Sequence, residues 1–171
     1  MAVKVIKLNK SNYSGRGVYG EYVKISERRG VKILYSDGHS SLASLKESTR
    51  YKEALQEHNL ISAARKVPFV LRSYGVVAIQ DGDLLFPGIL MTHIEGKLYN
   101  ELNHFNTVFP LREKLRAKLR TCGVNHNDLH GNNIIVKKHK NRYVAYAIDF
   151  SPNYVTLNTR LLKKLNKRRK R

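Results

Sequence analysis

The chain has 171 residues, too few for a large multidomain enzyme. Hydrophobic residues make up 42% of it, which is enough to bury a core. Lys and Arg number 32 against 13 Asp and Glu, so the net charge of +19 favours an anionic partner such as nucleic acid, an acidic protein or a phosphorylated ligand. The single cysteine, Cys122, excludes a disulfide framework and a Cys-rich zinc site. No apolar run is long enough to span a bilayer or to form a signal peptide. We therefore expect a soluble cytoplasmic protein or, in a eukaryotic host, a nuclear one.

The first half of the chain is predicted to be rich in strands. A Gly-, Ser- and Tyr-rich segment at 11–20 is expected to form a loop between the first two strands. A helix is expected from about Leu45 to Lys66, because apolar residues recur near helical spacing there and Pro68 follows. Asp81-Gly82 between two apolar runs predicts a hairpin. The expected strands are 3–8, 21–25, 31–35, 69–79 and 84–92.

The second half is predicted to be helical before it becomes β-structure again. Apolar residues recur at i, i+4, i+8 and i+11 between 111 and 122, which predicts an amphipathic helix. Pro110 is expected at its start and Gly123 at its end. Short apolar runs at 133–136 and 143–148 flank a basic turn and predict a final hairpin.

The segment GVNHNDLHGNNIIV at 123–136 is the most informative part of the sequence. Asp128 and Asn133 lie in a polar loop between the helix and the hairpin, and Asp149 follows the second hairpin strand. The hairpin should bring Asp149 beside Asn133, where their side-chain oxygens suit a hard cation such as Mg²⁺. Asp128 would be a second carboxylate, free to accept a proton. One proton acceptor and two oxygen ligands are the minimum for phosphoryl transfer from ATP.

Two other interpretations of this segment remain open. His126, Asp128 and His130 follow one another at two-residue spacing and could be metal ligands in a hydrolase. The same residues could also form a polar turn with no chemical role.

The sequence HNDLHGNN at 126–133, followed by Asp149-Phe150, resembles the catalytic loop and metal-binding motif of the protein-kinase-like superfamily. Its form looks most like the compact atypical branch, which includes aminoglycoside phosphotransferases, RIO-type kinases and the small kinase of the tRNA-modifying KEOPS complex. The resemblance implies that Asp128 is the catalytic base and that Asn133 and Asp149 are metal ligands. It also implies that Asn133 is a catalytic residue and that His126 is a scaffold residue.

Two features of the first half fit the same resemblance. Gly15-x-Gly17-x-x-Gly20 leads into a strand, which suits a kinase glycine-rich loop covering phosphates, whereas a dinucleotide-binding loop should lead into a helix. A flexible hairpin that uses glycine for its turns is the alternative. Lys32 lies between apolar residues on the next strand, and the resemblance directs it to the α- and β-phosphates. An ordinary solvent-facing strand lysine is the alternative for that position.

The expected helix and the second hairpin supply the remaining candidates. Glu57 lies on the apolar stripe of the helix and should be paired, because an unpaired buried charge is costly. Lys32 is its candidate partner, with Glu53 as the competing carboxylate. Met91 and His93 lie in a segment that resembles the hinge between kinase lobes, whose backbone would hold the adenine.

We therefore expect an α+β fold, a minimal two-lobed protein-kinase-like fold. A β-rich N-lobe with one helix should cover residues 1–92, and a truncated, mainly helical C-lobe should cover 93–162, followed by a basic tail at 163–171. Ser151 stands where the glycine of Asp-Phe-Gly usually does. Only 21 residues follow Phe150, without an Ala-Pro-Glu motif or the helices that complete a larger lobe.

The resemblance implies an ATP- and Mg²⁺-dependent kinase that transfers the γ-phosphate to a hydroxyl, with protein Ser/Thr as the expected acceptor. The alternatives are a nucleotide-binding pseudokinase, a basic module that associates with nucleic acid, and a small-molecule kinase. Retention of the four key polar residues, Lys32, Asp128, Asn133 and Asp149, favours an active enzyme. Seven of the nine residues at 163–171 are basic, so the tail should not pack alone, and its last few residues should be disordered or docked on a polyanion. We expect a protein substrate or partner, contact with nucleic acid or an acidic surface through this tail, and no membrane association.

Overall fold

The computed structural model describes residues 3–8, 13–17, 20–35, 37–102, 105–140 and 142–168. The chain divides into two compact units. Unit 1 comprises Met1–Asn59 and Arg72–His93, and unit 2 comprises Leu60–Leu71 and Ile94–Arg171. The segment Leu60–Leu71 thus belongs to unit 2, although it was expected to belong to the N-lobe at 1–92.

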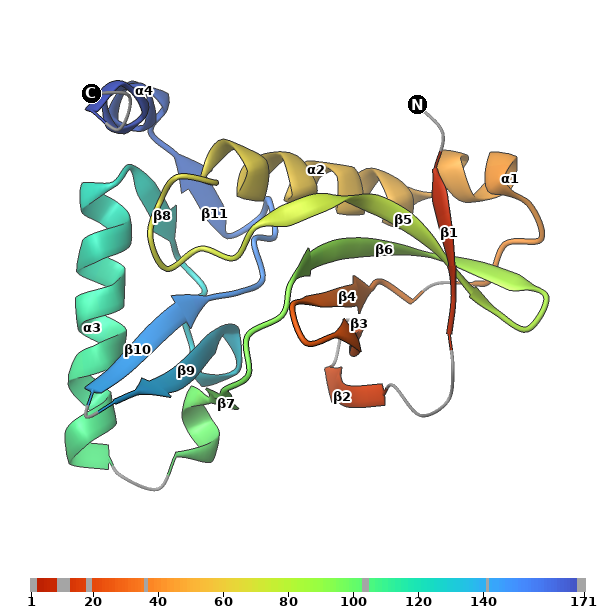
Figure 1. Ribbon diagram of the computed structural model, residues 1–171. Helices are drawn as coiled ribbons and strands as arrows, with labels where there is room; N and C mark the ends of the chain where they lie inside the picture. The colour runs from red at the N-terminus through yellow and green to blue at the C-terminus, as the bar shows by residue number, and fades with distance from the viewer. Residues whose placement is uncertain are drawn as a thin grey trace. The chain divides into compact units, whose positions relative to one another are not determined.

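Unit 1 is built on a six-stranded sheet with the strand order β1-β5-β6-β4-β3-β2. The edge strand β1 runs parallel to β5, and every other neighbouring pair is antiparallel. The glycine-rich segment, expected as a loop, contributes the opposite edge strand β2, and β5 and β6 form the longest hairpin (Figure 1). The strands are β1 (Lys4–Lys7), β2 (Tyr13–Gly17), β3 (Gly20–Ser26), β4 (Arg29–Ile33), β5 (Ser73–Asp81) and β6 (Leu84–Thr92).

The hairpin of β5 and β6 closes through the turn that the Asp-Gly signal predicted. Asp81 pairs with Leu84, so the turn consists of Gly82 and Asp83. Gly82 has a φ of +59°, which glycine adopts without the steric cost that a side chain would add. This turn sets the register that places the residues of β6 opposite those of β5.

The single helix expected over 45–66 is instead two helices in the structure. Ser48 separates them with an extended backbone. Its hydroxyl donates to the carbonyl of Leu45 at 2.7 Å and accepts from the N–H of Tyr51 at 3.1 Å. One serine side chain therefore ends the first helix and begins the second, because it replaces backbone hydrogen bonds at both ends. The bounds are α1 (Leu42–Glu47) and α2 (Thr49–Ala63).

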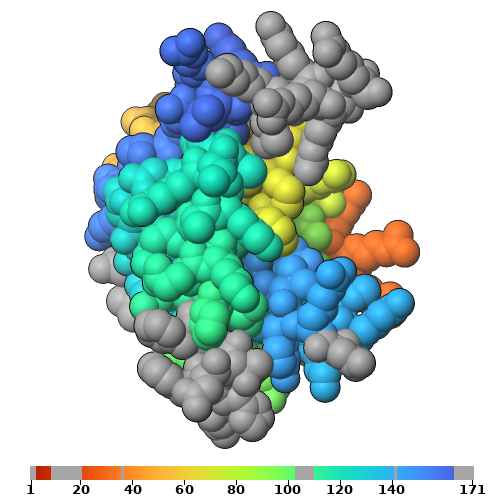
Figure 2. Space-filling view, turned by 90° about the vertical axis from the view of Figure 1, so that its left-hand side faces the viewer, coloured from red at the N-terminus to blue at the C-terminus, as the bar shows by residue number. Residues whose placement is uncertain are grey.

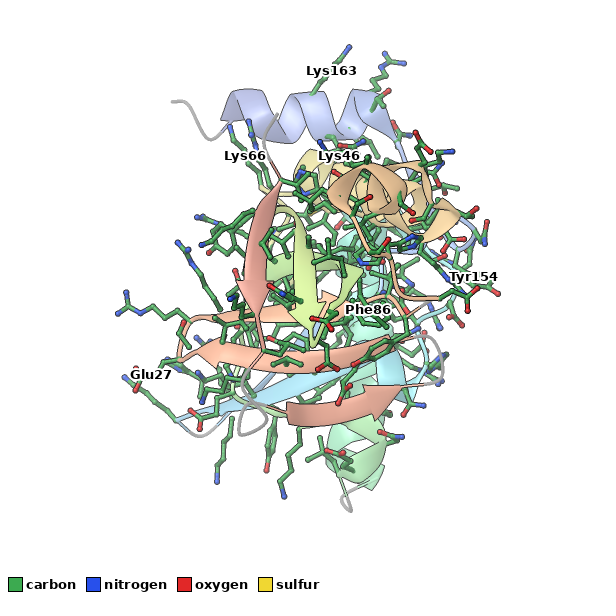
Figure 3. The ribbon with its side chains drawn as sticks, turned by 90° about the vertical axis from the view of Figure 1, so that its right-hand side faces the viewer. Glu27, Lys46, Lys66, Phe86, Tyr154 and Lys163 are labelled. Atoms are coloured by element: carbon green, nitrogen blue, oxygen red, sulfur yellow. The ribbon has the colours of Figure 1, made fainter. Side chains whose placement is uncertain are left out.

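The two faces of the unit 1 sheet differ in what they carry. One face forms an apolar core, against which Phe86 (labelled in Figure 3) and Tyr35 pack, with their rings edge to face. Because side chains alternate along a strand, Lys32 of β4 and its cross-strand neighbours Tyr22 and Ile89 lie on the other face. The buried residues of the apolar core are Val23, Val31, Ile33, Val77, Ile79 and Leu90.

Both helices of unit 1 pack on the Lys32 face of the sheet. Leu45 of α1 and Tyr51 of α2 are buried against Ala78 of β5. Ala78 shares its face with Lys32, since Val76, two residues before it, pairs with Ile89, and Ile89 pairs with Lys32. This packing brings the side chains of α2 to the same side of the sheet as Lys32.

The longest elements of unit 2 are α3 (Phe105–Thr121) and α4 (Thr159–Arg168). Helix α3 buries Leu115 and Leu119, as the periodicity predicted. It begins five residues before Pro110, so the proline lies inside the helix and not at its start. The ring removes only one N–H donor there, and the helix continues past it. Among the described residues, no helix is both long and apolar enough to cross a membrane.

Two small sheets accompany these helices in unit 2. Strands β10, β9 and β7 form one sheet in that order, and β11 pairs with β8 in the other. Strand β10 packs against α3 (Figure 1). The strands are β7 (Lys97–Leu98), β8 (Val124–His126), β9 (Ile134–His139), β10 (Arg142–Ala147) and β11 (Val155–Leu157), with short 3₁₀ helices η2 (Tyr99–Glu101) and η3 (Gly131–Asn133).

Helix α4 includes the first six residues of the basic tail, 163–168, although the tail was predicted not to pack alone. Asn158 caps it: its side-chain oxygen accepts from the N–H of Leu161 at 3.1 Å, and its own N–H donates to the carbonyl of Gly123 at 2.7 Å. Leu162 is buried. The cap and the buried leucine stabilise a helix that charge repulsion alone would oppose. Residues 169–171, where disorder was expected, lie outside the described residues.

Candidate active site

Lys32 and Glu57 form an ion pair within unit 1, in which the ammonium contacts both carboxylate oxygens. The Lys32 ammonium lies 3.0 Å from Oε1 and 2.8 Å from Oε2 of Glu57. The Glu57 side chain is 4% exposed and that of Lys32 is 20% exposed. The competing carboxylate, Glu53, pairs instead with Arg50 at 2.7 Å. The structure therefore resolves the choice of partner in favour of Glu57, and the pairing explains how a carboxylate can be buried on α2.

The glycine-rich segment forms the tip of the β2–β3 hairpin. Gly15 and Gly17 lie on β2 and Gly20 begins β3, with Gly17 directly opposite Gly20. Residues 18 and 19 lie outside the described part of the chain. The described residues thus place Gly17 and Gly20 at the paired ends of β2 and β3, and the role of this segment toward phosphates stays a prediction.

The segment at the end of β6 was expected to hold adenine through its backbone groups, and two of those groups already have partners. Met91 is buried, and the two peptide groups after it are already hydrogen-bonded inside unit 1. The N–H of Thr92 donates to the carbonyl of Arg72 at 2.8 Å, and that of His93 donates to the carbonyl of Arg28 at 3.0 Å. These two N–H groups are therefore engaged and do not serve as donors to an adenine in this arrangement.

Tyr22 is a residue of this region that the sequence reasoning missed. It lies opposite Lys32 on the sheet, and its ring covers Gly30 so closely that a Cβ at Gly30 would come within 2.0 Å of the hydroxyl. The ring also contacts His93. Burial raises the pKa of Tyr22 to about 12. Two sequence features could have indicated this role: Tyr22 follows Gly20 by two residues, and Gly30, against which its ring packs, precedes Lys32 by two.

Asp128 and Asn133 are joined directly in the loop of unit 2. The amide nitrogen of Asn133 donates to the backbone carbonyl of Asp128 at 2.9 Å and to its Oδ2 at 3.0 Å. Asn133 is buried, whereas Asp128 is partly exposed. With its nitrogen committed to Asp128, Asn133 presents its amide oxygen as the atom that can bind a cation.

The hairpin of β9 and β10 brings Asp149 next to Asn133. Ala147 pairs with Ile134, and the N–H of Ile148 then donates to the carbonyl of Asn133 at 3.0 Å. Asp149 follows immediately, with a φ of +60° that is unusual for a residue with a side chain. A carboxylate and a carboxamide oxygen at adjoining positions are hard ligands of the kind that Mg²⁺ prefers.

His126 braces this turn from β8. Its Nε2 donates to the carbonyl of Ile148 at 3.1 Å, and its ring packs edge to face with the buried Phe150 at 5.4 Å. Within the described residues, its buried Nδ1 has no hydrogen-bond partner. Burial lowers the pKa of His126, although hydrogen bonding to Ile148 and the charges of Asp149 and Asp128 oppose that shift. Both backbone groups of Ile148 are thus held, one by Asn133 and one by His126.

The alternative of a transition-metal site formed by His126, Asp128 and His130 gains no support. His126 uses one ring nitrogen on Ile148, and Nδ1 of His130 accepts from the N–H of Asn132 at 3.2 Å. In the part of the chain that the structure describes, no three His, Cys, Asp or Glu side chains are grouped to hold a metal ion.

Comparisons with known proteins bear on the fold. No protein-family model matches the sequence, and no curated protein matches it. Among solved structures, the chain resembles the Rio2 kinase of Chaetomium thermophilum in its ADP/Mg²⁺-phosphoaspartate complex, with a TM-score of 0.57 and 17% identity. The fold is protein-kinase-like. The match covers 94% of this chain and 57% of the Rio2 chain, so this kinase-like chain spans little more than half of that protein.

Proposed function

We propose that this chain is an ATP-dependent phosphotransferase that acts on a protein serine or threonine hydroxyl. The observation that carries the proposal is the hydrogen-bonded network of unit 2, in which Asn133 contacts both Asp128 and Ile148, the residue before Asp149. In this proposal the network supplies a carboxylate that can accept a proton and two oxygen ligands for a cation. The kinase-like fold adds support, since the Rio2 structure of similar fold is an ADP/Mg²⁺ complex.

In this proposal Lys32 neutralises the phosphates of ATP. Glu57 fixes the ammonium group, because two hydrogen bonds to one carboxylate leave the lysine little rotational freedom. A positioned cation stabilises the charge that develops on the phosphoryl oxygens in the transition state. The glycines at 15, 17 and 20 would let the β2–β3 tip approach the phosphates closely.

Asp128 has the role of proton acceptor. Its Oδ2 accepts from Asn133, which orients the carboxylate toward an incoming hydroxyl. The proton of that hydroxyl passes to the carboxylate as its oxygen forms the new bond to the γ-phosphorus, while the bond from that phosphorus to the β–γ bridging oxygen breaks and ADP leaves with the electron pair. Asn133 and Asp149 would hold the metal through oxygen. When bound, Mg²⁺ neutralises charge on the phosphate oxygens and leaving group.

Labelling with ATP tests this proposal. The purified chain is incubated with γ-labelled ATP and Mg²⁺, alone and with cell extract. We expect phosphate on Ser or Thr of one or a few proteins, and a loss of about 10²–10⁴ in rate for Asp128→Asn. Label on a low-molecular-weight alcohol would identify a small-molecule kinase instead. Hydroxylamine-labile label on the chain itself would indicate an aspartyl phosphate of the kind named for the Rio2 complex.

Binding is measured separately from turnover. Mg–ATP should raise the thermal stability of the native chain, because it binds only the folded state. Stabilisation without transfer to any acceptor would favour the pseudokinase. If millimolar Mg–ATP gives no stabilisation and no label is transferred, both the phosphotransferase and the pseudokinase are wrong.

A further inference from the structure

The positive charge of the chain is concentrated in unit 2. This unit contains 20 Lys and Arg against 5 Asp and Glu, whereas unit 1 contains 12 against 8. Unit 2 therefore carries +15 of the total +19. Two of its five carboxylates, Asp128 and Asp149, belong to the candidate active site, so the rest of its surface is more basic still.

Three elements of unit 2 hold most of these charges. Helix α3, the β9–β10 hairpin and α4 contain one acidic residue among them, Glu113. Arg116 lies 2.6 Å from this carboxylate and Arg112 lies 3.2 Å from it. We define the basic surface as the following residues of these elements: Arg112, Lys114, Arg116 and Arg120 of α3; Lys137, Lys138, Lys140 and Arg142 of the hairpin; and Arg160 and Lys163 of α4.

The three elements are joined to one another within unit 2. Strand β10 packs against α3, and Figure 2 shows α3 and the hairpin side by side on one face. At the other end of α3, Gly123 accepts a hydrogen bond from Asn158, the cap of α4. Figure 3 shows Lys163 pointing away from α4. The basic residues therefore line connected elements and are not scattered singly over the unit.

Every cation at the hairpin end of this surface is accessible to solvent. Lys137, Lys138, Lys140 and Arg142 are all exposed, and Lys140 lies at the turn with a φ of +54°. Along α3, Arg112 and Arg120 are eight residues apart, which spans about 12 Å of helix axis. Duplex DNA carries one charge per about 1.7 Å, so a polyanion crossing α3 and the hairpin meets several of these cations.

The composition of the surface distinguishes among anionic partners. Among the side chains that the structure describes, α3 from Pro110 on and the hairpin carry no large exposed apolar residue, and α4 up to Lys163 carries one, Leu161. Protein interfaces need an apolar or aromatic centre and are depleted in lysine, and membrane-surface helices need an apolar face to insert. Lys and Arg without an apolar centre instead match the phosphates of a nucleic acid.

We propose that the basic surface of unit 2 binds the phosphate backbone of nucleic acid without reading its sequence. Its cations contact phosphates and release counterions from the strand, so affinity falls steeply with salt. This surface differs from the tail at 163–171, for which the sequence predicted contact with nucleic acid, because most of its residues lie on α3 and the hairpin. It does not depend on phosphoryl transfer, because no active-site residue takes part.

Fluorescence anisotropy with a labelled 20-nucleotide RNA single strand, measured from 50 to 200 mM salt, tests the proposal. The test variant replaces Lys137, Lys138, Lys140 and Arg142 by Gln. The matched control removes the same charge from exposed positions of unit 1 with Lys4→Gln, Lys7→Gln, Lys46→Gln and Lys52→Gln. A second test variant, Lys114→Gln with Arg120→Gln, examines α3, and circular dichroism verifies that each variant folds.

We expect the hairpin variant to bind at least tenfold more weakly than the wild type at 100 mM salt. The slope of log K against log salt should decrease by about 0.7 for each phosphate that the variant no longer neutralises. The unit 1 control should stay within about threefold, and Asp128→Asn should bind RNA as the wild type does. Equally weakened binding in the test and control variants would overturn the proposal, since net charge alone would explain it. Competition by polyglutamate as effective as by unlabelled RNA of equal charge would also overturn it, in favour of an acidic protein.

Discussion

The hydroxyl of Tyr22 lies 3.0 Å from Nδ1 of His93, and the two rings stack with their centroids 5.8 Å apart. The residues are 71 positions apart in the sequence, and both belong to unit 1. Tyr22 thereby covers the strand face above Gly30, next to the segment expected to hold adenine. Under the proposed function, the base of ATP would need the space on the Lys32 face that the Tyr22 side chain fills in this arrangement.

The first prediction is that Tyr22→Phe binds Mg–ATP more tightly than the wild type. The phenylalanine keeps the ring but lacks the hydrogen bond to His93, which must break before the ring moves aside. A net hydrogen-bond free energy of about 0.5–1.5 kcal/mol corresponds to a Kd lowered by about 2- to 10-fold. Isothermal titration calorimetry measures the change. Tyr35→Phe removes a hydroxyl that donates to Glu21 at 2.6 Å, and this control should leave the Kd unchanged. Weaker binding by Tyr22→Phe would mean that the hydroxyl helps to hold the nucleotide.

Local patterns in the sequence predicted several central relationships of the fold and the site. The apolar stripe of α2 favoured Glu57 over Glu53 as the partner of Lys32, because only a residue on the buried face needs a cation close by. The two apolar runs around a basic turn placed Asp149 beside Asn133, since a hairpin returns its second strand to the start of the first. Both inferences needed only periodicity and a short connection.

Other features depend on contacts that no local pattern announces. From the sequence, Ser48 was predicted to lie within one helix. The break between α1 and α2 depends on the two hydrogen bonds of its side chain. The contact of Tyr22 on β3 with His93, which follows β6, joins residues far apart in the sequence and needs the register of β3, β4 and β6. Helix α4 was missed because the charge of the tail concealed the cap supplied by Asn158 and the burial of Leu162.

The second prediction concerns the stability of the buried ion pair. Lys32→Met leaves the Glu57 carboxylate without its bidentate partner and should lower the free energy of unfolding by about 3–5 kcal/mol. Glu57→Gln in the same chain should restore part of that loss, because the neutral amide is less costly to bury. The control is Arg50→Met, which breaks the more exposed pair with Glu53 and should cost less than about 1 kcal/mol. Urea unfolding measures all four chains. Equal losses of stability for Lys32→Met and Arg50→Met would contradict the prediction.

The third prediction separates backbone strain from metal binding at Asp149. Its φ of +60° suits Gly best and Asn next, and it strains Ala by about 1–2 kcal/mol. Among the three variants, thermal stability without ligand should therefore rank Asp149→Gly first, Asp149→Asn second and Asp149→Ala last. The stabilisation by Mg–ATP should be much smaller than in the wild type for all three variants, since each lacks the carboxylate. Differential scanning fluorimetry with and without Mg–ATP measures both effects, and an Ala variant as stable as the Gly variant would contradict the strain.

The fourth prediction follows from the burial of His126. Its pKa is lowered in the folded chain, because burial outweighs the carboxylates of Asp128 and Asp149, which favour the charged ring. The unfolded chain therefore binds the proton more readily, with a pKa of about 6.5. The contribution of this residue to stability is complete above that pH and is lost as the pH falls below it. In EDTA, the Tm of the wild type should decrease between pH 7 and pH 5 more steeply than that of His126→Gln, whose amide can still donate to Ile148. Burial also lowers the pKa of His58. The Tm of His126→Gln should therefore still decrease as the pH falls, but less steeply than that of the wild type. Identical slopes for the two chains would show that His126 does not titrate in this way.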